Sequence, residues 1–87
     1  SLINANATVG DNCIINNKVL IEHDVVVEDN CHIATGATIN GNVNIKKNTF
    51  IGSKTVTKES ITIGKNCIIG FGSKINKTIK PDSIIQN

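Results

Sequence analysis

A histidine flanked by two carboxylates, Glu22-His23-Asp24, is the part of this sequence best suited to chemistry. A carboxylate beside an imidazole can orient the ring tautomer and raise its basicity, which is what a general base needs. A second histidine, His32, follows nine residues later. Most surface histidines are only solvated side chains, so a base at His23 depends on what the fold places beside it.

The three cysteines, Cys13, Cys31 and Cys67, match neither a disulfide framework nor a metal site. Their number is odd and none belongs to a CxxC motif. A reactive thiol would be expected at an exposed position with a base nearby. We therefore expect three free, buried thiols that act as small apolar core residues, and we expect no metal.

Composition limits the chain to a single domain and excludes several classes of function. The 87 residues are 39% hydrophobic with a net charge of +2, which excludes disorder. The nine lysines are nearly balanced in number by seven acidic residues and form no basic run, so binding to nucleic acid is not expected. The longest apolar run has three residues, too few to enter a membrane. Because nothing resembles a secretory leader, a cytoplasmic protein is expected.

A six-residue period supplies the elements that must position these groups. Twelve of thirteen positions in one column are Ile or Val, and the remaining one is Thr. Four positions after the members of this column, nearly all residues are small, and three positions after them Asn, Asp and Gly dominate. The column is Ile3, Val9, Ile15, Ile21, Val27, Ile33, Ile39, Ile45, Ile51, Thr57, Ile63, Ile69 and Ile75.

Each repeat therefore reads as a short strand followed by a tight corner. Asn, Asp and Gly adopt left-handed backbone angles at low cost, which suits them to corners. Uninterrupted hexads of this kind are typical of a parallel β-helix, in which three hexads close one coil. The chain is predicted to be an all-β, three-sided solenoid of between four and five coils.

The β-helix is predicted to occupy residues 1–80, followed by a C-terminal tail at 81–87. Pro81 falls where the next inward aliphatic residue is expected, and proline cannot donate to the backbone ladder. At the other end, Ser1 and Leu2 lead straight into the repeat. Because uncovered strand edges are unusual, we expect a piece of a larger protein or a partner over the open end.

The repeat places the two histidines on different parts of the prism. His23 lies at a corner, and Gly41 one coil further along leaves space beside the ring for a ligand. His32 points outward from a face that is otherwise apolar, and an apolar face predicts an interface between subunits. The two histidines could share a site only across that boundary. The outward residues of the face are Ile14, His32, Phe50 and Ile68.

Three segments, residues 16–24, 32–37 and 63–70, resemble the hexapeptide-repeat acyltransferases. The similar branch contains the sialic acid O-acetyltransferases and the UDP-4-amino-sugar N-acetyltransferases. The most specific feature is the Glu-His-Asp corner followed nine residues later by His-Ile-Ala. The resemblance implies a left-handed β-helix, a homotrimer, and acetyl-CoA as acyl donor in a cleft between subunits. The apolar ladder predicts that the trimer forms through the face of Ile14, His32, Phe50 and Ile68.

The resemblance also assigns roles to individual residues. It implies that His23 is the general base, that Asp24 raises its basicity, and that Glu22 supports them. Asn16 matches a supporting position that binds the acceptor substrate. The acceptor would be an amine or hydroxyl of a sugar or nucleotide-sugar. The residues expected to contact acetyl-CoA are His32, Gly41, Ser53, Gly70 and Phe71.

Some features depart from that family and leave other functions open. Relatives carry an N-terminal nucleotide-sugar-binding domain with no counterpart here, and the third coil has Ser53-Lys54-Thr55 where small residues are usual. A structural or oligomerisation module, or an inactive fragment, is the main alternative. A carbonic anhydrase of this fold would need three histidines on zinc, and the chain has two. An ice-binding solenoid would need a flat threonine ladder, which the outward threonines do not form.

Overall fold

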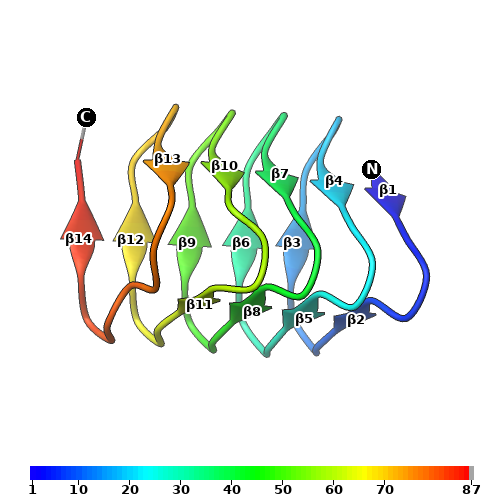
Figure 1. Ribbon diagram of the computed structural model, residues 1–87, viewed down its shortest axis with the longest axis horizontal. Coiled ribbons are helices and arrows are strands. Elements are labelled where there is room, and N and C mark those ends of the chain that lie inside the picture. The colour runs from blue at the N-terminus through cyan, green and yellow to red at the C-terminus, as the bar shows by residue number, and fades with distance from the viewer. Residues whose placement is uncertain (87) are drawn as a thin grey trace.

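The computed structural model describes residues 1–86, which wind into a triangular parallel β-helix of about five turns (Figure 1). The predicted all-β, left-handed solenoid is confirmed. Two sheets have five strands and one has four, because each of the first four coils adds one two-residue strand to every sheet and the last coil contributes only a single bridge, Ile79 to Ile63, to the second. In this part of the chain, no helix is long and apolar enough to cross a membrane.

The strands fall into three sheets that share the period of the sequence. The first sheet contains β1 (Leu2–Ile3), β4 (Leu20–Ile21), β7 (Thr38–Ile39), β10 (Val56–Thr57) and β13 (Lys74–Ile75). The second contains β2 (Thr8–Val9), β5 (Val26–Val27), β8 (Asn44–Ile45) and β11 (Thr62–Ile63). The third contains β3 (Ile14–Ile15), β6 (His32–Ile33), β9 (Phe50–Ile51), β12 (Ile68–Ile69) and β14 (Ile84–Ile85).

Residues eighteen apart stack on one another, so the core is built from columns of like side chains. Ile21 pairs with Ile39 in the first sheet, and Val27 pairs with Ile45 in the second. All four of these side chains are 0–1% exposed. Each coil therefore buries the aliphatic column of its neighbours and pairs their backbones, which explains how a chain with two aromatic residues forms a core.

The corners have the backbone geometry that the Asn, Asp and Gly column predicts. Eleven residues other than glycine have a positive φ between 57° and 63°, and most are Asn or Asp. Lys18, Lys54 and Ser60 adopt the same left-handed angles with φ of 59–61°. Corner geometry is therefore set by coil stacking, and it holds even where the side chain does not favour it.

The expected end of the β-helix at Lys80 is wrong. Strand β14 pairs in parallel with β12, matching Ile84 to Ile68 and Ile85 to Ile69. This offset is sixteen residues, whereas Ile68 and Phe50 in the coil before are eighteen apart. The last coil is therefore two residues short. Residues 81–86 of the expected tail belong to it, and residue 87 lies outside the described residues.

The shortening moves Pro81 from the core to a corner, where proline is tolerated. Its position matches Lys65 one coil earlier, and the next residue, Asp82, takes the left-handed φ of 63°. The ladder bond at this corner comes from the Asp82 N–H, which donates to Lys65 O at 2.9 Å. Pro81 thus has no ladder bond to supply, and its fixed φ suits the start of a turn.

The cysteines occupy one inward column, two of them fully buried. Cys31 and Cys67 are 0–1% exposed, but Cys13 is half-buried because it lies in the first described coil. Each thiol donates to a carbonyl of the following coil: Glu28 O at 3.1 Å, Lys46 O at 3.1 Å and Lys80 O at 3.3 Å. Burial raises the pKa of the Cys31 thiol. The prediction of free thiols is confirmed, and that of full burial holds for two of three.

Thiol labelling should follow this burial. An alkylating reagent should modify Cys13 first in the native protein, because only the exposed thiolate reacts. Cys31 and Cys67 should react at a measurable rate only after a denaturant opens the coils. Mass spectrometry of timed aliquots measures the order, and rapid native labelling of Cys67 would contradict the register described above.

Candidate functional site

His23 and Asp24 form an exposed pair at the corner between β4 and β5. His23 Nδ1 lies 3.1 Å from Asp24 Oδ2, with the two side chains 60% and 49% exposed. The backbone fixes both residues: the Asp24 N–H donates to Ala5 O, and His23 O accepts from the Asn42 N–H, each at 3.1 Å. When Nδ1 carries the proton toward Asp24, Nε2 keeps its lone pair. The pair therefore has the geometry of a base with an orienting carboxylate.

The space beside His23 is filled by its own ring. A Cβ atom added to Gly41 would stand 2.7 Å from His23 Nε2 and 2.8 Å from Cε1. The imidazole thus lies against the Gly41 backbone. The sequence predicted space for a ligand beside His23. This prediction is wrong, because the missing side chain of Gly41 makes room for the imidazole itself.

Glu22 faces outward at the end of β4 and is held by the first coil. Its Oε1 accepts a hydrogen bond from Asn4 Nδ2 at 2.8 Å. Asp24, rather than Glu22, is the carboxylate that contacts the imidazole. The sequence placed both acids next to His23, but the corner turns only one of them toward the ring.

Asn16 and His32 meet on the third sheet, away from His23. Asn16 Nδ2 lies 3.1 Å from His32 Nε2. The ring of His32 also contacts Phe50 edge to face, with centroids 5.1 Å apart and planes at 87°. Within one chain, the two histidines therefore belong to separate clusters.

Three of the expected cofactor contacts gather at the corner that leads from the third sheet to the first. Ser53 O accepts from the Gly72 N–H at 2.7 Å, and Gly70 O accepts from Ser73 Oγ at 2.7 Å. Phe71 stands at the same corner and is 73% exposed. Gly41 and His32 lie elsewhere, at another corner and on the sheet face. A single chain thus brings Ser53, Gly70 and Phe71 together but not all five residues.

The predicted apolar face is present and longer than expected. Ile14, Phe50 and Ile68 are exposed, and β14 adds Ile84, which is 63% exposed. The signal for Ile84 was the Ile84-Ile85 pair, which repeats Ile68-Ile69 sixteen residues later. We call this set the apolar strip: Ile14, His32, Phe50, Ile68 and Ile84.

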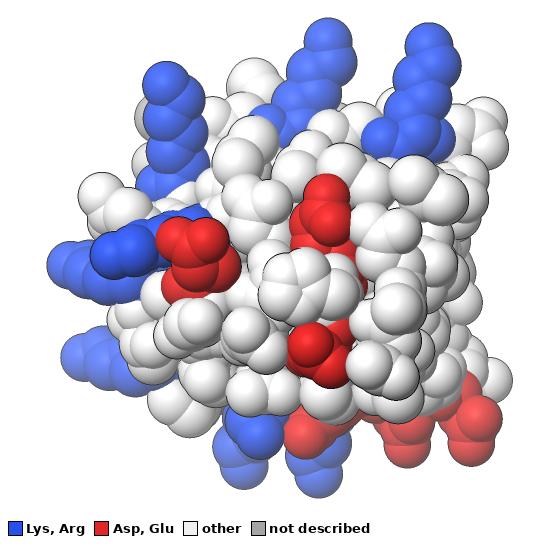
Figure 2. Space-filling view, turned by 45° about the vertical axis from the view of Figure 1, so that its right-hand side comes forward, with Lys and Arg blue, Asp and Glu red and all other residues white. Residues whose placement is uncertain are grey.

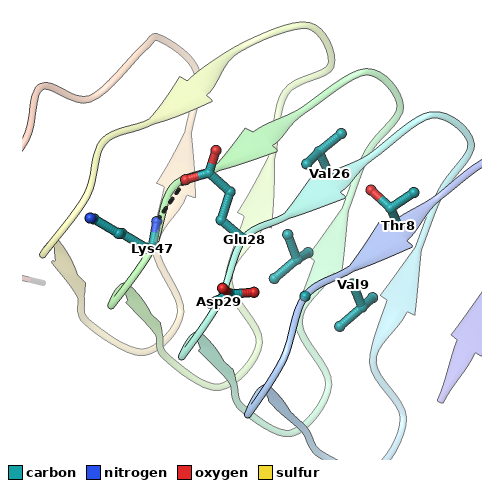
Figure 3. Close-up of a pocket in the computed structure, with 8 residues that line it drawn as sticks. Thr8, Val9, Val26, Glu28, Asp29 and Lys47 are labelled. Atoms are coloured by element: carbon teal, nitrogen blue, oxygen red, sulfur yellow. Dashed lines mark hydrogen bonds between the residues drawn. The ribbon is translucent and has the colours of Figure 1, made fainter.

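Two hollows among the described residues lie away from the expected site residues. One of about 320 Å³ opens over β2 and β5, where Thr8, Val9 and Val26 form one side and Glu28, Asp29 and Lys47 the other (Figure 3). Glu28 is already engaged there, since its Oε1 accepts from the Lys47 N–H at 3.2 Å. A second, of about 340 Å³, lies over β10 and β13. Neither is lined by an expected site residue.

Charge is distributed unevenly along the axis of the β-helix. Five of the seven acidic residues fall within residues 11–29, and eight of the nine lysines fall within residues 46–80. Figure 2 shows acidic side chains at the centre and lower right of one face and another among lysines on its left, with lysines projecting from its upper, left and lower margins. The first coils are thus acidic and the later coils basic.

Solved structures with the same fold are known. A histidine-to-asparagine variant of perosamine N-acetyltransferase from Caulobacter crescentus, in complex with CoA and GDP-perosamine, matches with a TM-score of 0.93 at 26% identity. The match covers 94% of this chain and 39% of that one. The acetyltransferase domain of PglB from Neisseria gonorrhoeae, in complex with acetyl coenzyme A, matches with a TM-score of 0.72. At 19% identity, over 95% of this chain and 49% of that one, this second likeness concerns the fold alone.

The sequence itself carries the family assignment. No curated protein sequence matches the chain. The family model described as bacterial transferase hexapeptide (six repeats) matches residues 3–41 and 42–77, and so confirms the predicted resemblance to hexapeptide-repeat acyltransferases. Matched over most of its length, the chain belongs to the bacterial transferase hexapeptide family.

Proposed function

We propose that this chain is the catalytic β-helix of an acetyltransferase that moves an acetyl group from acetyl-CoA to a sugar or nucleotide-sugar. The observation that carries the proposal is the His23–Asp24 pair, with Nδ1 3.1 Å from the carboxylate, at a β-helix corner. The likeness to a perosamine N-acetyltransferase in complex with CoA and GDP-perosamine supports it. The accepting atom is an amine nitrogen or a hydroxyl oxygen.

In the proposed reaction, His23 Nε2 takes a proton from the acceptor as its nitrogen or oxygen attacks the thioester carbonyl. Asp24 holds the Nδ1 proton and stabilises the imidazolium that forms. A backbone N–H near Gly41 would stabilise the negative charge that develops on the carbonyl oxygen. The proton then passes from His23 to the departing thiolate of CoA, which restores the neutral imidazole. Neither a metal nor a covalent enzyme intermediate is needed.

Binding of acetyl-CoA is proposed along the later coils, between subunits. Ser53, Gly70 and Phe71 share one corner there, and exposed Phe71 offers an apolar contact. The lysines of residues 46–80 complement the phosphates of CoA. His32 would contact the cofactor or acceptor from the neighbouring subunit, and Asn16, which touches His32, would help bind the acceptor.

The apolar strip is proposed as the face of a homotrimer. A column of exposed isoleucines and a phenylalanine on one sheet of three is a surface that soluble proteins usually cover. Such an assembly would bring a corner of one subunit close to a face of the next. A cytoplasmic location is proposed as well, because the three cysteines are free.

A structural or oligomerisation module is the second candidate. It is favoured by one observation: the expected site residues line neither of the two hollows described above. The chain also spans 39% of the length of the perosamine N-acetyltransferase it matches. Binding of acetyl-CoA separates the two candidates, because a structural module has no reason to bind it.

Calorimetric titration with acetyl-CoA should give saturable binding, with a dissociation constant between about 1 μM and 1 mM, the usual range of enzyme affinities. Phe71→Ala should weaken binding, since it removes the exposed apolar contact at the proposed cofactor corner. Thr8→Ala, in the hollow over β2 and β5, is the control and should bind normally. The absence of heat from the unmodified trimer at millimolar acetyl-CoA would favour the structural module.

A further inference from the structure

Gly41 holds a corner position that elsewhere always carries a side chain. The structure gives it no left-handed φ, so its backbone angles are open to any residue. Conformation therefore does not explain why glycine is present. The residues at the equivalent first position of the other corners are Ala5, Asp11, Asn17, His23, Asp29, Thr35, Lys47, Ser53, Glu59, Lys65, Phe71 and Pro81.

The room that the His23 ring needs beside residue 41 does explain why glycine is present. The three atoms nearest to an added Cβ would be His23 Nε2 at 2.7 Å, Cε1 at 2.8 Å and Cδ2 at 3.3 Å. All three belong to the imidazole. By contrast, a Cβ added at Gly52 would meet the backbone N of Phe71, and one added at Gly64 would meet the backbone N of Pro81, both in the next coil. Those two glycines therefore allow the coils to stack.

We propose that Gly41 is a positioning residue whose missing side chain forms the seat for the His23 imidazole. The ring is held at two points, by Asp24 Oδ2 on Nδ1 and by the Gly41 backbone beneath Nε2 and Cε1. The Asn42 N–H, which donates to His23 O, keeps the two corners in register. The inference rests on the proposed function, in which Nε2 must stay unobstructed to take a proton.

A methyl group at residue 41 should therefore act mainly on His23. Its ring is an exposed side chain, so it can swing aside at low cost to folding. In doing so it would leave the seat and lose the fixed contact with Asp24. Gly41→Ala keeps the backbone N–H proposed to stabilise the thioester oxygen, and the KM for acetyl-CoA reports separately on the cofactor contact expected at Gly41.

The first experiment measures the tautomer of the His23 imidazole in the 87-residue chain. Nitrogen-15 NMR of His23 should show one fixed tautomer, protonated at Nδ1, in the unmodified chain and lose it in Gly41→Ala. Thermal unfolding of four variants gives a second measure. In the His23→Ala background, Gly41→Ala should raise Tm by a few degrees, because alanine restricts the unfolded chain. With His23 present, that gain should be absent.

The second experiment measures acetyl transfer by the protein as its gene encodes it. Gly41→Ala should lower kcat by roughly 10²-fold, the effect of a misplaced catalytic group, with little change in KM for acetyl-CoA. Glu59→Ala, the same corner position one coil further along, should leave kcat unchanged. An intact tautomer together with equal Tm shifts in both backgrounds would overturn the seat. If His23→Ala leaves kcat intact, the base assignment fails instead, while the NMR and Tm results still decide on the seat.

Discussion

Replacing His23 by alanine should lower kcat for acetyl transfer by about 10²- to 10⁴-fold, the usual contribution of a general base. The KM for acetyl-CoA should hardly change, since the proposed cofactor contacts lie at the corner of Ser53, Gly70 and Phe71. The effect is thus expected on the chemical step and not on binding. Steady-state kinetics of the protein as encoded, with acetyl-CoA and an amino-sugar nucleotide, measure both constants.

Two further variants make the result specific to the base. Asp24→Asn should reduce kcat less than His23→Ala, because it weakens the orientation of the ring without removing it. Asp11→Ala changes the corresponding position of another corner, which carries no expected site residue, and should leave kcat unchanged. A protein that keeps its kcat after His23→Ala would reduce the Glu-His-Asp corner to ordinary surface residues.

Phe50→Glu should convert the proposed homotrimer into monomer or aggregate. Phe50 lies in the middle of the apolar strip, against His32, and a carboxylate there would be forced out of water at an unpaired position. Light scattering coupled to size-exclusion chromatography gives the mass directly. Activity should fall together with assembly, because the proposed site requires the two histidine clusters to meet across a subunit boundary.

The first sheet supplies a matched control for the interface. Val56 on β10 is 42% exposed, close to the 36% of Phe50 on β9. Val56→Glu should therefore keep the trimer, since it introduces the same charge at a similar exposure on a face that is not proposed to assemble. A trimer that survives Phe50→Glu would show that the subunits associate elsewhere.

The fold was predictable because the sequence repeats with a fixed period of six residues, so each column of side chains corresponds to one position of the repeat. Every sixth residue points into the core, so counting alone places Ile21 over Ile39 and Asn30 at a left-handed corner. The same counting failed at Pro81, because it assumed that no hexad changes length. The last coil is two residues short, and the pairing of Ile79 with Ile63 and of Ile84 with Ile68 reveals it.

The candidate site was predictable in its membership but not in its arrangement. Sequence neighbours identified His23 with Asp24, which the structure places 3.1 Å apart. They could not tell that Glu22 turns toward Asn4, or that the ring of His23 lies on Gly41, because both depend on side-chain direction at a corner. Any contact between the cluster of His23 in one subunit and that of His32 in the next would form only on assembly, so it cannot be seen in a single chain.

Acetylation of a nucleotide-linked amino sugar is the most direct test of the central claim. The protein as encoded should be incubated with acetyl-CoA and the sugar nucleotide, and the products measured by mass spectrometry beside those of His23→Ala. The account predicts an acetylated sugar with equimolar release of CoA, reduced by about 10²- to 10⁴-fold in the variant. Equal product from both proteins, or no product from an unmodified protein that fails to bind acetyl-CoA, would contradict it.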